Sequence, residues 1–220
     1  MVGVMASQFS CPWDYDRKEI FADCIVHILG IVTAIGGAAV LIVIAVHAGN
    51  IRRVTAVAIY LGSLLIMFFS SAVYNLWPVT PFKWWLRRFD HSAIYLLIAA
   101  TYTAFMLPVY GAVPAVALAT IWIAALLGIA IKIMLPDRFD KMSVPLYLTT
   151  GWSGALAIGP VAAVLTPVTL FLILAGGALY SFGVVFHVWC GLRFQNAIWH
   201  GFVLVAAACH YAAVLTSVTE

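Results

Sequence analysis

The chain has 220 residues, of which 65% are hydrophobic and only 9% are charged. A soluble domain carries roughly 25% charged residues, so this composition excludes an ordinary soluble protein and predicts an integral membrane protein. The formal net charge of +3 is small and dispersed along the chain, and it does not indicate a nucleic-acid-binding protein.

Seven predominantly apolar stretches follow one another with short connections. Each has about 20 residues, which is the length a helix needs to span a bilayer. We therefore predict an all-α membrane protein, a seven-transmembrane helix bundle that forms a single domain over residues 1–220. The predicted spans are residues 23–46, 54–77, 89–109, 113–134, 144–163, 169–189 and 197–217.

The lysines and arginines predict the orientation. Nine of the 11 fall on the side that holds the N-terminus, and only Arg52 and Arg53 fall on the other. Because cytoplasmic loops carry the excess of basic residues, we predict a cytoplasmic N-terminal segment (residues 1–19) and an outside C-terminus. The first residues lack the apolar region of a cleavable signal peptide, so the first span is expected to direct insertion.

The four cysteines show no CxxC spacing, so neither a disulfide framework nor a zinc knuckle is indicated.

Polar side chains collect at the cytoplasmic ends of the predicted spans. Asn75 follows Ser71 by four residues, and His200 follows Asn196 by four, so each pair shares one helix face. Polar groups at one membrane depth are costly and usually functional, although capping of helix ends and contact with headgroups explain them too. The other members of this layer are Glu19, Asp23, His27, Asp90, His91 and His187.

Asp90 leads the third predicted span and has two interpretations. Its carboxylate suits a helix N-cap, where it accepts hydrogen bonds from free backbone N–H groups. An ionised carboxylate at this depth is also expected to face protein, water or a partner rather than lipid. The two roles do not exclude each other.

Several stretches together resemble a known family. FDHSAIYLLIAATYTAF (89–105) is similar to the DHSxIYxLIAGTYTPF signature of the bacterial hemolysin III proteins, which belong to the progestin and adipoQ receptor superfamily. Four further motifs agree in order, and the resemblance implies a multi-pass protein of the bacterial inner (plasma) membrane. These motifs are KEIFADCIVHILG (18–30), SSAVYN (70–75), GGALYSFGVVF (176–186) and NAIWHGFVLVAAACH (196–210).

The resemblance implies zinc, held by one histidine of the second motif, two histidines of the last motif, and the aspartate of DHS directly or through water. Here the histidine positions are Asn75, Asn196 and His200, and the aspartate is Asp90. An amide oxygen is a much weaker zinc ligand than imidazole. We therefore expect a degenerate site with no zinc or weakly bound zinc, in which His187 could act as a substitute ligand.

By resemblance to membrane ceramide hydrolases, the reaction would be hydrolysis of a lipid amide, in which a metal acidifies water and polarises the carbonyl. Asp90 would then act as base, Ser71 as hydrogen-bond donor, and His200 as ligand or acid. The loss of two histidines removes the main electrophile. Two other functions stay open: a haemolytic or channel activity, and a non-catalytic, receptor-like protein that binds membrane lipid.

Overall fold

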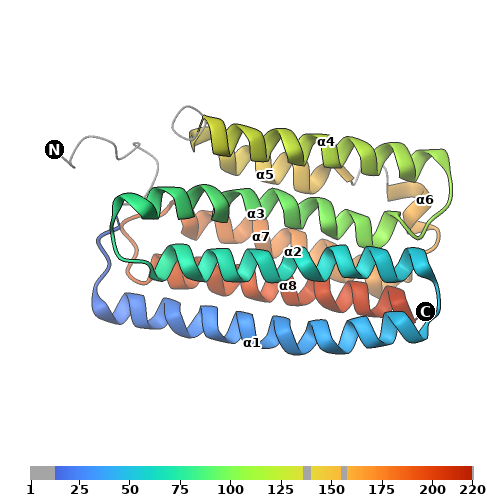
Figure 1. The fold of residues 1–220 in the computed structure, drawn as a ribbon, viewed down its shortest axis with the longest axis horizontal. Helices are drawn as coiled ribbons and strands as arrows, with labels where there is room; N and C mark the ends of the chain where they lie inside the picture. Colours follow the sequence, from blue (N-terminus) through green and yellow to red (C-terminus); the bar gives the residue numbers. More distant parts are fainter. Residues whose placement is uncertain (1–12, 136–139, 155–157, 220) are drawn as a thin grey trace.

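The computed structural model describes residues 13–135, 140–154 and 158–219, and these residues form helices and no strands. The helices run side by side as an elongated bundle joined by short connections (Figure 1). They are α1 (Arg17–His47), α2 (Ile51–Leu76), α3 (Pro81–Met106), α4 (Ala112–Met134), α5 (Asp140–Ser153), α6 (Ile158–Ala162), α7 (Pro167–Val188) and α8 (Gln195–Thr219).

Among the described residues, five helices are long and apolar enough to cross a membrane: α1, α2, α4, α7 and α8. This finding supports a multi-pass membrane protein. The range of the fifth predicted span, 144–163, holds the two shorter helices α5 and α6, and α5 has Pro145 in its interior. Proline removes a backbone donor and interrupts the helical hydrogen-bond ladder.

Helix α3 begins earlier than the apolar pattern predicts. Its N-cap is Thr80, and Pro81 occupies the first turn, where the fixed φ of proline favours a helix start. The basic and aromatic residues that follow continue the helix, so Asp90 lies well inside it. The interpretation of Asp90 as an N-cap is therefore wrong.

Helix α1 also begins before its predicted apolar stretch, because a capping box precedes it. The Asp16 side chain accepts from the backbone N–H groups of Lys18 and Glu19, and the Glu19 Oε2 atom accepts from the Asp16 N–H at 2.9 Å. These hydrogen bonds hold the pKa of Asp16 below its usual value, and the one from the Glu19 N–H has the largest effect. Arg193, whose guanidinium lies 3.3 Å from the Asp16 carboxylate, lowers the pKa further.

Packing brings helices distant in the sequence together: α8 lies against both α1 and α7, and α2 lies between α1 and α3. Small residues let the α7–α8 pair approach closely. A Cβ atom on Gly183 would lie 2.8 Å from the Phe202 Cβ, and one on Gly176 would lie 3.1 Å from the Ala206 carbonyl oxygen. The α7–α8 distance therefore depends on these glycines.

The cysteines depart from expectation at one position. Cys190 is disulfide-bonded, whereas Cys24 and Cys209 are free. The expectation of no disulfide is wrong for Cys190.

Gly183→Ala should destabilise the bundle by about 1–3 kcal/mol, because the added methyl group overlaps an atom fixed to the α8 backbone. The measurement is the thermal unfolding midpoint of the detergent-purified protein. Gly36→Ala is the matched control, since a Cβ there meets no atom within 4 Å and alanine favours a helix. Equal midpoints for the two variants would contradict the close packing of α7 on α8.

Candidate functional site

The start of α1, the end of α2 and the start of α8 meet at one end of the bundle. Each contributes two side chains four residues apart, which a helix places on one face. The first residue of each pair is Asp23, Ser71 or Asn196, and the second is His27, Asn75 or His200. We call these six residues the polar cluster.

Asp23 is the centre of the polar cluster. Its Oδ1 atom lies 2.6 Å from His200 Nδ1, and its Oδ2 atom accepts a 3.0 Å hydrogen bond from Asn196 Nδ2. Asp23 is 5% exposed and His200 is 9% exposed. A carboxylate so deeply buried is costly unless it is paired and hydrogen-bonded, and here both oxygens have a partner.

Both nitrogens of the His27 ring have partners. Nδ1 lies 2.8 Å from the Asp23 backbone oxygen and 3.6 Å from Asp23 Oδ1, and Nε2 lies 3.2 Å from Ser71 Oγ. The ring centroids of His27 and His200 are 4.5 Å apart. The two imidazoles therefore lie side by side around one carboxylate.

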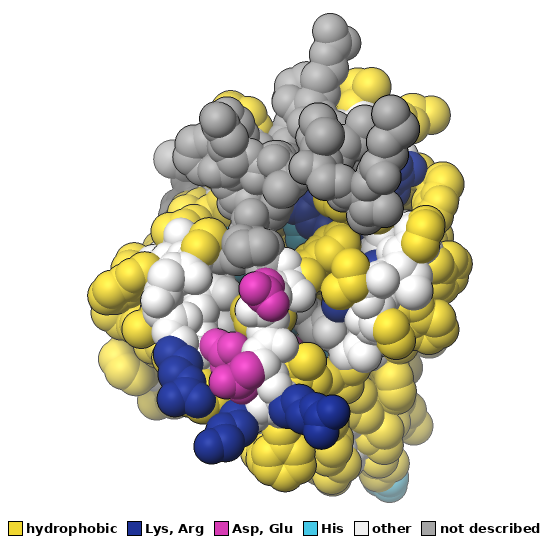
Figure 2. Space-filling model, turned by 90° about the vertical axis from the view of Figure 1, so that its left-hand side faces the viewer, with side chains coloured by type: hydrophobic (Ala, Val, Ile, Leu, Met, Phe, Trp, Pro, Cys, Tyr) yellow, Lys and Arg dark blue, Asp and Glu magenta, His cyan; other side chains and the backbone are white. Residues whose placement is uncertain are grey.

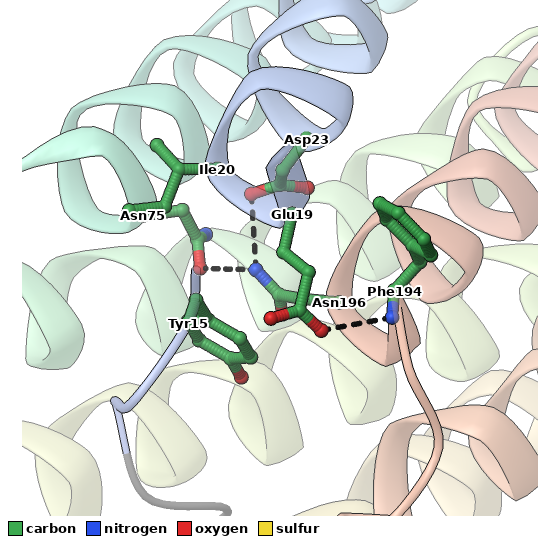
Figure 3. Close-up of a pocket in the computed structure, with 7 residues that line it drawn as sticks. All are labelled: Tyr15, Glu19, Ile20, Asp23, Asn75, Phe194 and Asn196. Carbon is green, nitrogen blue, oxygen red and sulfur yellow. Dashed lines mark hydrogen bonds between the residues drawn. The ribbon is translucent and has the colours of Figure 1, made fainter. Parts of the chain in front are cut away.

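The two asparagines join α2 to α8. Asn196 Nδ2 donates to Asn75 Oδ1 at 3.1 Å (Figure 3). Asn75 Nδ2 donates to the Ser71 backbone oxygen at 2.9 Å. Asn75 Nδ2 also lies 3.5 Å from His200 Nε2. Lys83 fixes this end of α2 by donating to the backbone oxygens of Asn75 and Trp77.

A small pocket of about 10 Å³, roughly the size of one water molecule, adjoins the polar cluster. Glu19 and Phe194 line it, and the Glu19 Oε1 atom accepts a 2.9 Å bond from the Phe194 N–H (Figure 3). Burial, followed by the nearby negative charges of Asp23 and Glu19, raises the pKa of Tyr15 to about 12, so its hydroxyl stays protonated. Figure 2 shows this end, where acidic side chains lie beside basic ones. The lining residues are Tyr15, Glu19, Ile20, Asp23, Asn75, Phe194 and Asn196.

Asp90 adjoins the polar cluster from α3. It is buried, it makes a side-chain hydrogen bond with Ser71, and it interacts electrostatically with His200 and Arg87. The other two predicted members lie elsewhere. His91 faces Tyr74, with ring centroids 6.3 Å apart, and His187 packs against Trp199 at 4.9 Å.

In the described part of the chain, the group of three metal-ligating side chains is Asp23, His27 and His200, whose ligand atoms lie within 4.8 Å of one another. The positions that the resemblance implies for zinc do lie close together, but the side chains present there do not suit a zinc ion. Two of them carry neutral amides, which are engaged with neighbouring polar groups.

Sequence reasoning placed Asp23 and His27 in the polar layer but did not combine the two in a metal site. Their four-residue spacing on α1 was the available signal, because it repeats the spacing in α2 and α8. The pairing of α1 with α8 brings His200 to them, and a sequence alone does not indicate that pairing.

Comparison with known proteins places these motifs in context. The model of the family described as "Haemolysin-III related" matches residues 17–211. Hemolysin-3 homolog of Bacillus subtilis (strain 168) is 37% identical over 199 residues, covering 90% of this chain and 93% of that protein. Hemolysin-3 of Bacillus cereus is 38% identical, covering 90% and 91%.

A mammalian protein is also similar. The human monocyte to macrophage differentiation factor is 32% identical over 205 residues, covering 89% of this chain and 83% of that protein. No solved structure matches the chain. The matches extend over nearly all of the chain and include every motif on which the resemblance rests. The chain therefore belongs to the haemolysin-III related family of membrane proteins.

Proposed function

We propose that this protein acts on the polar head of a membrane lipid amide, which is hydrolysed at the polar cluster. The observation that carries the proposal is the buried 2.6 Å pair of Asp23 and His200, set among hydrogen-bonding amides and a hydroxyl. Ionisable groups inside membrane helices are retained for function more often than for stability.

The side chains have complementary roles in amide hydrolysis. Asp90 takes the proton of the attacking water, and the Ser71 hydroxyl turns its single proton to the amide carbonyl. His200, oriented by Asp23, delivers a proton to the departing amine nitrogen. A bound metal, when present, supplies Lewis-acid activation of the carbonyl.

A second candidate is non-catalytic lipid binding. The specific observation in its favour is that Asn75 and Asn196 occupy two histidine positions of the family pattern and bond to each other at 3.1 Å. Neutral amides recognise a polar headgroup without supplying an electrophile.

Release of free fatty acid from an N-acyl lipid by the detergent-purified protein tests the proposal. Asp90→Asn should lower the rate about 10²-fold or more, because it removes the general base. Ser217→Ala is the control, since that hydroxyl bonds only within its own helix among the described residues. Lipid binding without release would favour the second candidate. Dye release from lipid vesicles, with neither binding nor hydrolysis, would instead favour the haemolytic activity in the relatives' names.

At the zinc positions that the resemblance implies, we expect little or no metal, and we expect that histidines placed there would restore zinc binding. The Asn75→His, Asn196→His double variant should bind zinc more tightly than the wild type, because positions 75, 196 and 200 already meet. Bound zinc per chain, measured after identical chelator-free purification, is the readout. A wild type that carries a full equivalent through mild chelation, and an Asp23→Asn variant that keeps it, would contradict this expectation.

We also propose that the bundle crosses the bacterial inner membrane seven times with its N-terminus in the cytoplasm. The basic residues on one side support this orientation, whereas the disulfide at Cys190, on that same side, is more usual in an oxidising compartment. Reporter fusions at Gly49 and at Glu220 should read as outside, and one at Pro81 as inside. A cytoplasmic reading at Glu220 would refute the seven-span arrangement.

A further inference from the structure

Asp23, His27 and His200 are arranged around a common point. Asp23 Oδ1 lies 2.6 Å from His200 Nδ1 and 3.6 Å from His27 Nδ1, and one ligand atom from each residue lies within 4.8 Å of the others. In a tetrahedral zinc site with bonds of about 2.0–2.2 Å, the ligand atoms are roughly 3.3–3.5 Å apart. Side-chain movements that part Asp23 Oδ1 from His200 Nδ1 and turn the ligand nitrogens toward the ion would reach this geometry.

The atoms that face away from this point also have partners. Asp23 Oδ2 accepts from Asn196, His27 Nε2 meets Ser71 Oγ at 3.2 Å, and His200 Nε2 lies 3.5 Å from Asn75 Nδ2. Proteins orient metal-binding carboxylates and imidazoles through such outer contacts, which fix the ring and the tautomer. If Asp23 served only as the partner of His200, the site would not need a second imidazole, that of His27, oriented by a polar contact on its outer nitrogen.

We infer that Asp23, His27 and His200 form a divalent transition-metal site built on α1 and α8, distinct from the positions that the family resemblance implies. Two imidazoles and one carboxylate are a donor set that zinc and related ions accept, with a further position left for a non-protein ligand. Of the family-implied positions, the inferred site keeps only His200. It uses neither Asp90 nor the side chains at 75 and 196 as ligands.

This site binds its ion weakly, for a reason visible in the hydrogen bonds. Coordination must replace the 2.6 Å bond between Asp23 Oδ1 and His200 Nδ1, and the bond of His27 Nδ1 to the Asp23 backbone oxygen. Both are lost when the nitrogens turn to the metal.

Zinc titration of the chelator-stripped protein in detergent tests the inference, and no lipid is needed. The wild type should bind one Zn²⁺ per chain, and Asp23→Asn and His27→Gln should each weaken binding roughly tenfold or more. His47→Gln is the matched control, because His47 makes the same ring contact to a backbone oxygen four residues earlier on α1. Asp90→Asn should weaken binding less than either variant, because Asp90 is no ligand although its charge acts on His200.

Co²⁺ provides a readout that does not depend on variants that fold well. In the wild type it should give the strong visible absorption of a four- or five-coordinate ion with nitrogen and oxygen ligands, reversed by added Zn²⁺. No saturable Zn²⁺ binding, or loss of binding in Asp90→Asn with retention in Asp23→Asn, would overturn the inference. Because the proposed function is measured as fatty-acid release or lipid binding, its failure and the failure of this site are separate results.

Discussion

The arrangement of this end of the bundle depends on the pairing of Asp23 with His200. A carboxylate held among apolar helices is tolerated only when charged or hydrogen-bonding groups surround it, and removing one partner of such a pair typically costs about 3–5 kcal/mol. The 2.6 Å contact therefore selects one register of α1 against α8. A slip of either helix by one residue would turn one of these side chains toward lipid.

Asn75 and Asn196 show how side-chain chemistry can change while a fold is kept. They stand where the resemblance implies histidine, and their amides bond to each other and to Ser71 and Asp23. An amide pair satisfies itself through complementary donors and acceptors, whereas adjacent imidazoles at these positions would require a shared cation or proton. Of the polar cluster, α2 therefore contributes no ionisable side chain, whereas α1 contributes Asp23 and His27.

The sequence was sufficient for the helical class and for most helix positions, because long apolar stretches admit few other structures in a membrane. Helix starts were less predictable. Asp16 and Glu19 begin α1 through a capping box, and Pro81 begins α3 ahead of its apolar residues, so hydrophobicity alone placed both starts too late. The misplaced start of α3 is also why Asp90 was read as a cap.

The site was predictable within each helix and not between helices. Four-residue spacing identified the shared faces of Ser71 with Asn75 and of Asn196 with His200. The central role of Asp23 depends on its contact with His200, 177 positions away, and a local sequence pattern cannot predict such a contact. The same limit applies to His187, whose depth suggested a ligand but whose ring packs on Trp199.

Glu19 has a consequence for how the site opens. One oxygen closes the capping box of α1, and the other accepts the Phe194 N–H just before α8, where Phe194 has a left-handed φ of 60°. Glu19 lines the small pocket beside the polar cluster, so a movement of its carboxylate that widened this pocket would also remove part of the α1 cap. Widening of the pocket and fraying of the first turn would then share one local equilibrium, whose free energy can be far smaller than that of unfolding the bundle.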